Sequence, residues 1–143
     1  MTTSRHSVSV AAAIVDDQDR VLVIQRRDNG KWQPPGGVLE LDESITEGLA
    51  REVREETGLE VQAERLTGVY KNLKLGVVAL VFRAIRTGGT ETLGEETAAI
   101  EWWDTATIQR RSDPAFAVRL LDAFRGDGAP AVRSHDGLNL IDR

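Results

Sequence analysis

Three glutamates lie within five positions of one another near the middle of the chain: Glu52, Glu55 and Glu56. Spacings of three and four residues place side chains on the same face of an α-helix. Three carboxylates on one face repel each other, and partial burial increases the repulsion. A hard divalent cation, which prefers oxygen ligands, would neutralise them. A solvated acidic face is the other interpretation of such a charge run, so these residues alone leave both interpretations open.

The segment around the glutamates carries the signals of a helix with defined ends. Ser44 followed by Glu47 is a capping-box pattern, which predicts a helix that begins at about Ser44. Gly58 predicts its end, because glycine readily takes the left-handed conformation after a last turn. The preceding run at 34–37, Pro-Pro-Gly-Gly, predicts an irregular loop rather than a strand. Apolar residues recur every four positions in the helix and predict its buried stripe, namely Ile45, Leu49 and Val53.

Residues 37–59 follow the pattern G-x5-E-x7-R-E-U-x-E-E-x-G-U, in which U is aliphatic. This pattern resembles the Nudix box, and every fixed position is matched, although the box covers only about a sixth of the chain. Residues 32–37 are similar to the W-x-x-P-G-G run that precedes the box, with one additional proline. The resemblance implies an α/β fold, a Nudix-type α/β/α sandwich with a mixed β-sheet between helices, in which a loop–helix–loop carries the active site.

Family resemblance also supplies the expected reaction. It implies a metal-dependent pyrophosphohydrolase that cleaves a diphosphate linkage in a nucleoside di- or triphosphate derivative through attack of water on phosphorus. Mg²⁺ suits a site made only of oxygen ligands, with Mn²⁺ as a substitute. The resemblance makes Arg51 a candidate catalytic residue of the box, and we interpret it as a structural residue that forms an ion pair with Glu43 and orients loop and helix. By position, the resemblance implies as metal ligands Glu52, Glu55, Glu56 and the Gly36 carbonyl.

The general base is expected on a loop before a tryptophan-bearing strand, as in several family members. The loop at 94–97 precedes Trp102, and we favour Glu96 over Glu95 as the base. Other family members take the base from the box, which makes Glu55 a competing candidate. Both loop glutamates can equally be solvated surface acids.

Substrate contacts are expected from an arginine and two tryptophans. Arg26 and Arg27 end a predicted strand, and by resemblance to MutT-type members Arg27 is the phosphate contact, through bidentate hydrogen bonds. Trp32 and Trp102 are candidates for contact with the substrate, although aromatic residues at strand spacing also build cores. The proline of many ADP-ribose hydrolases is absent, with Leu75 at about its position, so triphosphate and diphosphate-sugar substrates both remain open.

Alternating and continuous apolar patterns predict the other elements. The run at 76–85 is the most apolar and is expected to be a central strand. Asp136-Gly137 is a hairpin turn signal in a C-terminal extension at 131–141. The predicted strands are 7–15, 20–27, 60–70, 76–85 and 100–103, with a second helix at 114–124.

Composition sets limits on the class of protein. The 143 residues predict a single domain, 1–143, and the absence of cysteine excludes disulfides and thiolate metal sites. The net charge of −5 argues against binding to a nucleic-acid backbone. No long apolar run or leader-like segment is present, so we expect a cytoplasmic protein without a membrane partner, as a monomer or homodimer. The alternative function is a catalytically silent Nudix-fold module that binds or senses a nucleotide.

Overall fold

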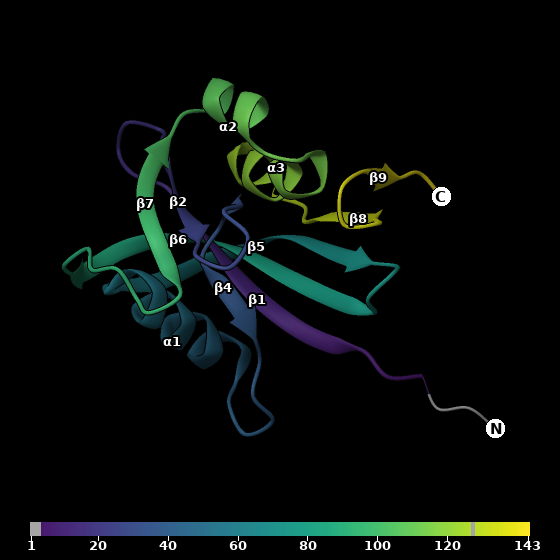
Figure 1. Cartoon of the computed structure of the whole chain (residues 1–143), viewed down its shortest axis with the longest axis horizontal. Coiled ribbons are helices and arrows are strands. Elements are labelled where there is room, and N and C mark those ends of the chain that lie inside the picture. Colours follow the sequence, from purple (N-terminus) through teal and green to yellow (C-terminus); the bar gives the residue numbers. More distant parts are fainter. Residues whose placement is uncertain (1–3, 127) are drawn as a thin grey trace.

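Two β-sheets lie between helices in the computed structural model, which describes residues 4–126 and 128–143 (Figure 1). The first sheet has six strands in the order β4-β1-β6-β5-β8-β9, and the second has three in the order β3-β2-β7. The strands are β1 (Ser7–Ile14), β2 (Val21–Arg26), β3 (Trp32–Gln33), β4 (Gly36–Val38), β5 (Leu59–Asn72), β6 (Val77–Gly89), β7 (Thr97–Trp103), β8 (Ala131–His135) and β9 (Leu140–Ile141). The helices are α1 (Ile45–Thr57), α2 (Thr105–Arg111) and α3 (Pro114–Leu121), with a 3₁₀ turn at Asp122–Phe124.

The larger sheet is mixed, as predicted. β6 pairs parallel with β1 and antiparallel with β5, so the most apolar predicted strand is central. β8 pairs parallel with β5, and β9 closes the C-terminal hairpin against β8. The separate three-stranded sheet was not predicted, since period-two patterns identify strands but not which strands share a sheet.

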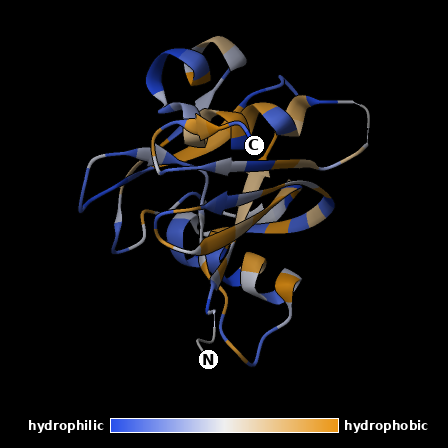
Figure 2. Ribbon diagram, turned by 90° about the vertical axis from the view of Figure 1, so that its right-hand side faces the viewer, coloured by the Kyte–Doolittle hydropathy of each residue, from blue (hydrophilic) through white to orange (hydrophobic). Residues whose placement is uncertain are grey.

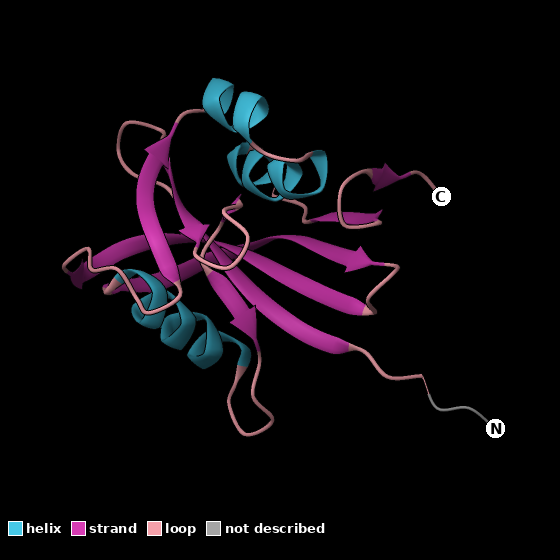
Figure 3. Ribbon diagram, viewed as in Figure 1, coloured by secondary structure: helices cyan, strands magenta, loops and turns pink. Residues whose placement is uncertain are grey.

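Helices cover both faces of these sheets (Figures 1 and 3), and two apolar clusters fill the spaces between the layers. β1 contributes to both, because successive side chains of a strand point to opposite faces. Val10, Ala12 and Ile14 pack in the cluster beneath α1, whereas Ala11 and Ala13 pack in the cluster beneath α2 and α3. Hydrophobic colour is concentrated on the strands in the middle of the molecule (Figure 2).

The ends of α1 match the sequence prediction. Ser44 caps the helix by accepting a hydrogen bond from the Glu47 N–H, and the Glu47 side chain completes the capping box. Gly58 ends the helix in the left-handed conformation, with φ of 75°. The predicted buried stripe was wrong at Ile45, which is 43% exposed, because residues 45–47 of the first turn of α1 lie in solvent and burial begins at Gly48.

Two other expectations need correction. The Pro-Pro-Gly-Gly run is not wholly irregular, because Gly36–Val38 forms β4 and pairs antiparallel with β1. A side chain at Gly36 would collide with the Val10 carbonyl, so only glycine permits this close pairing. The helix α2 was missed. Its signal is Asp104, whose carboxylate accepts a hydrogen bond from the Thr107 N–H at 2.8 Å as an N-cap.

In the described part of the chain, no helix is long and apolar enough to cross a membrane.

Candidate active site

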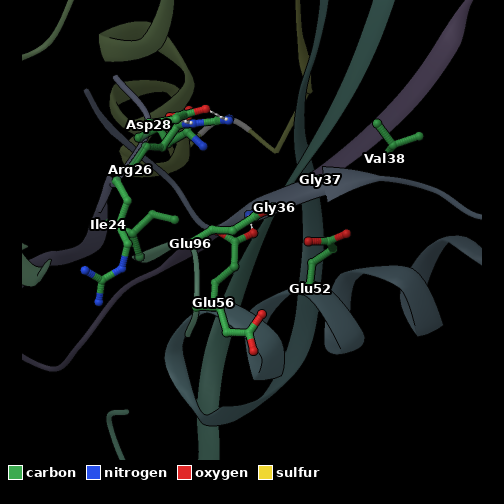
Figure 4. A pocket seen from close by; sticks show the side chains of 12 residues that line it. Ile24, Arg26, Asp28, Gly36, Gly37, Val38, Glu52, Glu56 and Glu96 are labelled. Atoms are coloured by element: carbon green, nitrogen blue, oxygen red, sulfur yellow. Dashed lines mark hydrogen bonds and ion pairs between the residues drawn. The ribbon is translucent and has the colours of Figure 1, made fainter. Parts of the chain in front are cut away.

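Two glutamates of α1 converge on the backbone of β4 (Figure 4). Glu52 and Glu56 are one turn apart, and the Gly36 N–H donates a hydrogen bond to Glu56 Oε1 at 3.1 Å. A Cβ at Gly37 would lie 2.5 Å from Glu52 Oε1, so the absence of a side chain at this position allows the carboxylate to approach β4. The glycine pair of the sequence pattern therefore brings backbone and carboxylates together.

Glu56 is a carboxylate with too little positive charge around it. Burial, and then the adjacent carboxylate of Glu52, raise the pKa of Glu56 to about 8. The Gly36 N–H and the charge of Arg26 act in the opposite direction but are outweighed. A pair of interacting acids in a cleft is typical of a functional site rather than a structural one.

The guanidinium of Arg51 forms hydrogen bonds with acids other than Glu56. It donates to Glu43 at 2.6 and 2.9 Å and to Glu52 at 3.0 Å. The predicted ion pair between Arg51 and Glu43 is thus present, and it ties the start of the loop to the middle of α1. The hydrogen bond from Arg51 lowers the pKa of Glu43 to about 2.

Glu55 lies apart from the other two box glutamates. Its side chain is 59% exposed and lies 3.4 Å from Arg51. It lines a shallow hollow with Glu52, Glu56, Glu95 and Glu96 rather than the main cleft.

A hard divalent cation requires several oxygen ligands around it, and the acidic cluster supplies some of them. Among the described residues, no three acidic or histidine side chains converge as a ready-made metal cage. Two carboxylates, Glu52 and Glu56, do meet beside the Gly36 backbone, and Mg²⁺ is usually bound by one or two carboxylates while it keeps several waters. The oxygen-only donor set therefore fits such an ion, and positive charge bound there would favour the ionised form of Glu56, whose pKa is otherwise raised.

The loop at 94–97 lies against the end of α1. The hydroxyl of Thr97 and the N–H of Gly94 both donate to the Glu56 carbonyl, at 2.9 and 3.4 Å. A side chain at Gly94 would collide with the Glu55 carbonyl, so this loop needs glycine to come so close. These contacts bring Glu95 and Glu96 to the cleft that Glu52 and Glu56 line.

The opposite wall of the cleft carries positive charge. The cleft encloses about 460 Å³ and is lined there by Arg26, Arg27, Asp28 and Gln33. Arg26 donates to both carboxylate oxygens of Asp28, at 2.6 and 2.8 Å. The exposed Arg27 holds the loop by donating its backbone N–H to the Glu96 carbonyl at 3.0 Å. Neither Asp28 nor Gln33 was singled out from the sequence. Gln33 comes here through the pairing of β3 with β2, opposite Ile24, whereas Asp28 directly follows the two arginines in the chain.

The two candidate tryptophans lie elsewhere. Trp32 stacks obliquely on Trp103 at 5.2 Å between ring centroids, and the guanidinium of Arg111 lies 5.2 Å from its ring. Trp102 packs against the apolar cluster beneath α1. Neither is among the described residues that line the cleft.

Comparison with known proteins gives a consistent result. The family model for the NUDIX domain matches residues 5–124. A MutT-like protein from Streptomyces ambofaciens is 53% identical over 136 residues, which are 95% of this chain and 88% of the relative. An 8-oxo-dGDP phosphatase from Homo sapiens is 35% identical over 136 residues, which are 93% of this chain but only 37% of that protein. The crystal structure of an ADP-ribose pyrophosphatase from Streptococcus suis superposes with a TM-score of 0.75 at 25% identity, covering 90% of this chain and 98% of that one. This chain therefore belongs to the NUDIX family of hydrolases.

Proposed function

We propose that this protein is a metal-dependent pyrophosphohydrolase that cleaves the diphosphate linkage of a nucleoside di- or triphosphate derivative. The observation that carries the proposal is a cleft of about 460 Å³, in which two glutamates of α1 face two arginines. Acidic oxygens on one wall suit a divalent cation, and guanidinium groups on the other suit the oxygens of a diphosphate.

The residues that would hold the cation are Glu52, Glu56, Glu55 and the carbonyl of Gly36. When bound there, Mg²⁺ supplies positive charge against the diphosphate and makes a bound water more acidic, and Mn²⁺ is the natural alternative. Glu52 and Glu56 orient that charge toward the cleft, since both are fixed on one helix beside β4. Arg51 acts by positioning, because its hydrogen bonds to Glu43 and Glu52 hold the loop and the carboxylate in place.

The diphosphate would be gripped from β2. Arg27 makes no side-chain ion pair within the described ranges, and it borders the cleft, so it is free to turn toward phosphate. Arg26 is already bound to Asp28 and contributes mainly its charge. Trp32 and Trp102 would contact substrate only beyond the cleft itself.

A carboxylate that lines the cleft would remove the proton from the attacking water. Glu96 is the proposed base, because the 94–97 loop places it across from Glu56 in the same cavity. Glu95 shares that position, and Glu55 borders the adjoining hollow, so both are tested beside it.

The relatives named above suggest which substrates to examine. The activities of those relatives concern 8-oxo-dGDP and ADP-ribose. In this chain Leu75 stands at about the position of the proline found in many ADP-ribose hydrolases. The panel should therefore contain nucleoside di- and triphosphates, their 8-oxo-guanine forms, and nucleotide sugars. We expect a small nucleotide substrate rather than nucleic acid, and a cytoplasmic protein that is a monomer or homodimer.

One assay tests this proposal. Purified protein is incubated with the panel and Mg²⁺ in ¹⁸O-labelled water, and the products are identified by mass spectrometry. We expect hydrolysis of at least one nucleotide, its loss with chelator, and ¹⁸O in a single product that identifies the attacked phosphorus. Binding of nucleotides without any turnover would instead favour a silent nucleotide-binding module.

A further inference from the structure

A buried arginine outside the acidic cleft has no anionic partner among the residues that the structure describes. Arg119 on α3 is 9% exposed. Its guanidinium carbon lies 4.8 Å from the ring centroid of Phe116 and 5.4 Å from that of Tyr70. Within residues 4–126 and 128–143 no carboxylate lies within ion-pair distance of it, and its buried Nε has no hydrogen-bond partner.

The polar contact of Arg119 with His135 does not satisfy it. Arg119 Nη2 lies 3.1 Å from His135 Nε2. The Gly137 N–H donates to His135 Nδ1 at 3.0 Å. A neutral imidazole has one acceptor nitrogen, so Nε2 then carries the proton and faces Arg119 as a second donor. Burial, and then the charge of Arg119, hold the pKa of His135 below its usual value, which keeps the ring neutral.

Arg119 lines a cavity that has no acid among the described residues of its wall. The cavity encloses about 190 Å³, and the part of its wall formed by described residues includes Arg119 and Arg26 but neither aspartate nor glutamate. It adjoins the acidic cleft, because Gln33, Gly36 and Gly37 line both. A molecule bound in the cleft can therefore extend into it.

Packing alone does not account for an arginine here. A buried charge without an opposite charge beside it is costly to the fold. Burial lowers the pKa of Arg119 only to about 10, so the group is charged at neutral pH. Contacts with two aromatic rings offset part of the cost, but they leave the in-plane N–H donors of the guanidinium unused.

We propose that the cavity at Arg119 is a second anion subsite, which takes a phosphate or carboxylate carried by the substrate away from the hydrolysed diphosphate. The inference rests on the proposed function for its substrate, which becomes a nucleoside diphosphate derivative with an additional anionic group. Arg119 donates to two oxygens of that group through its fork of N–H donors. Its contact with His135 brings the C-terminal hairpin, which lies beyond the NUDIX match at 5–124, into substrate selection.

Binding experiments test the subsite without any need for turnover. Inorganic phosphate, titrated into wild type, Arg119→Met and Arg110→Met, is followed by thermal unfolding. The exposed Arg110 provides the control, since its replacement removes the same charge outside the cavity. We expect phosphate to raise the Tm of wild type and Arg110→Met by several degrees, and to raise that of Arg119→Met clearly less.

Two matched ligand pairs then test whether the anion belongs to the substrate: ADP-ribose with its 2′-phosphate, and dephospho-coenzyme A with coenzyme A. By calorimetry we expect the phosphorylated ligand of at least one pair to bind wild type and Arg110→Met at least tenfold more tightly. In Arg119→Met the ratio of Kd values should approach one, and Arg119→Lys should retain part of it.

Several results would overturn the subsite. These are an equal phosphate shift in wild type and Arg119→Met, no preference in either ligand pair, or an Arg119→Met that unfolds well below wild type in phosphate-free buffer, which would make Arg119 a packing residue. The proposed function fails by a different result, the absence of hydrolysis across the nucleotide panel.

Discussion

Asp122 is buried and Glu56 is partly buried, and the chain surrounds these two carboxylates in opposite ways. Asp122, at the end of α3, receives two hydrogen bonds of 2.8 Å from Arg133 and one of 2.7 Å from the Tyr70 hydroxyl. Burial acts to raise the pKa of Asp122, but these donors outweigh it and hold the pKa below its usual value. Glu56 has one backbone N–H and a neighbouring acid, and its pKa rises to about 8.

This difference separates a structural acid from a candidate functional one. Where a carboxylate serves the fold, the chain supplies its counter-charge and its donors. Where counter-charge is missing, a bound ion or substrate is the partner that completes the site. The arginines show the same division, since Arg133 is paired with Asp122, whereas none of the described acids lies within ion-pair distance of Arg119.

Replacing Glu56 with glutamine should produce the largest effect on activity and is the most direct test of the contrast between Glu56 and Asp122. We expect kcat to fall by about three decades or more, the equivalent of several kcal/mol of transition-state stabilisation. The Tm should stay close to that of wild type, because the raised pKa of Glu56 already favours its neutral form and the glutamine oxygen can still accept from the Gly36 N–H. Steady-state kinetics at saturating Mg²⁺ and calorimetric unfolding measure the two quantities. Near-normal turnover in the folded variant would remove Glu56 from the active site.

Glu96→Gln tests whether Glu96 accepts a proton as the general base or, like Glu52 and Glu56 in the same cleft, serves to bind the cation. We expect kcat to fall by about two to four decades with a modest change in KM, as for loss of a general base. Glu95→Gln is the matched control and should keep most of its activity. Recovery of the lost rate with more Mg²⁺ or with Mn²⁺ would make Glu96 an accessory ligand. A wild-type rate, with Glu95→Gln or Glu55→Gln inactive, would move the base to that residue.

Asp122→Asn tests the structural side of the comparison. It leaves Arg133 without its carboxylate, and we expect a loss of about 2–3 kcal/mol in the free energy of unfolding. Turnover at a temperature where the variant is folded should stay close to wild type. Asp42→Asn makes the same change of charge at an exposed position and should unfold in denaturant like wild type. A variant as stable as wild type would show that pairing at Asp122 is not what separates it from Glu56.

Glu43 is a third case, an acid at the edge of the site that is paired with Arg51. For this pair we expect a smaller effect, on stability, that depends on pH. Arg51 lowers the pKa of Glu43 in the folded protein from 4.5 to about 2. A depressed pKa contributes stability that is complete above the unfolded value and is lost as pH falls from about 4.5 toward 2. Glu43→Gln should therefore have a lower Tm at neutral pH and a flatter Tm profile in that window. Glu40→Gln, which alters an exposed acid nearby, should keep the wild-type slope. An unchanged slope in Glu43→Gln would mean that the pair adds nothing to stability.

Sequence patterns predicted the parts of this site that depend on neighbours within a turn or two of helix. The capping box at Ser44 and the glycine stop at Gly58 act locally, and both are present as predicted. The burial of Ile45 was predicted wrongly, because the spacing gives the apolar face of the helix but not where along the helix the core begins.

Long-range contacts were beyond these patterns. Nothing in the local sequence indicates that Gly36 pairs with β1, or that the 94–97 loop returns to the end of α1. In the sequence, Arg119 is one charge on a helix with an apolar face. Only the folded structure shows that Tyr70 and His135 surround it, without an anionic partner among the described residues. The roles proposed for the site residues stay predictions.

The docking of the 94–97 loop has a consequence for the exchange of backbone amide hydrogens. The loop and its neighbour Thr92 bond to the last carbonyls of α1, those of Glu56 and Thr57. The final turn of the helix therefore cannot fray without releasing the loop, and both should exchange as one cooperative unit. A single local opening would then withdraw Glu96 together with Glu56, so amides at Gly94 and Thr97 would lose protection at the same rate as those of the last helical turn.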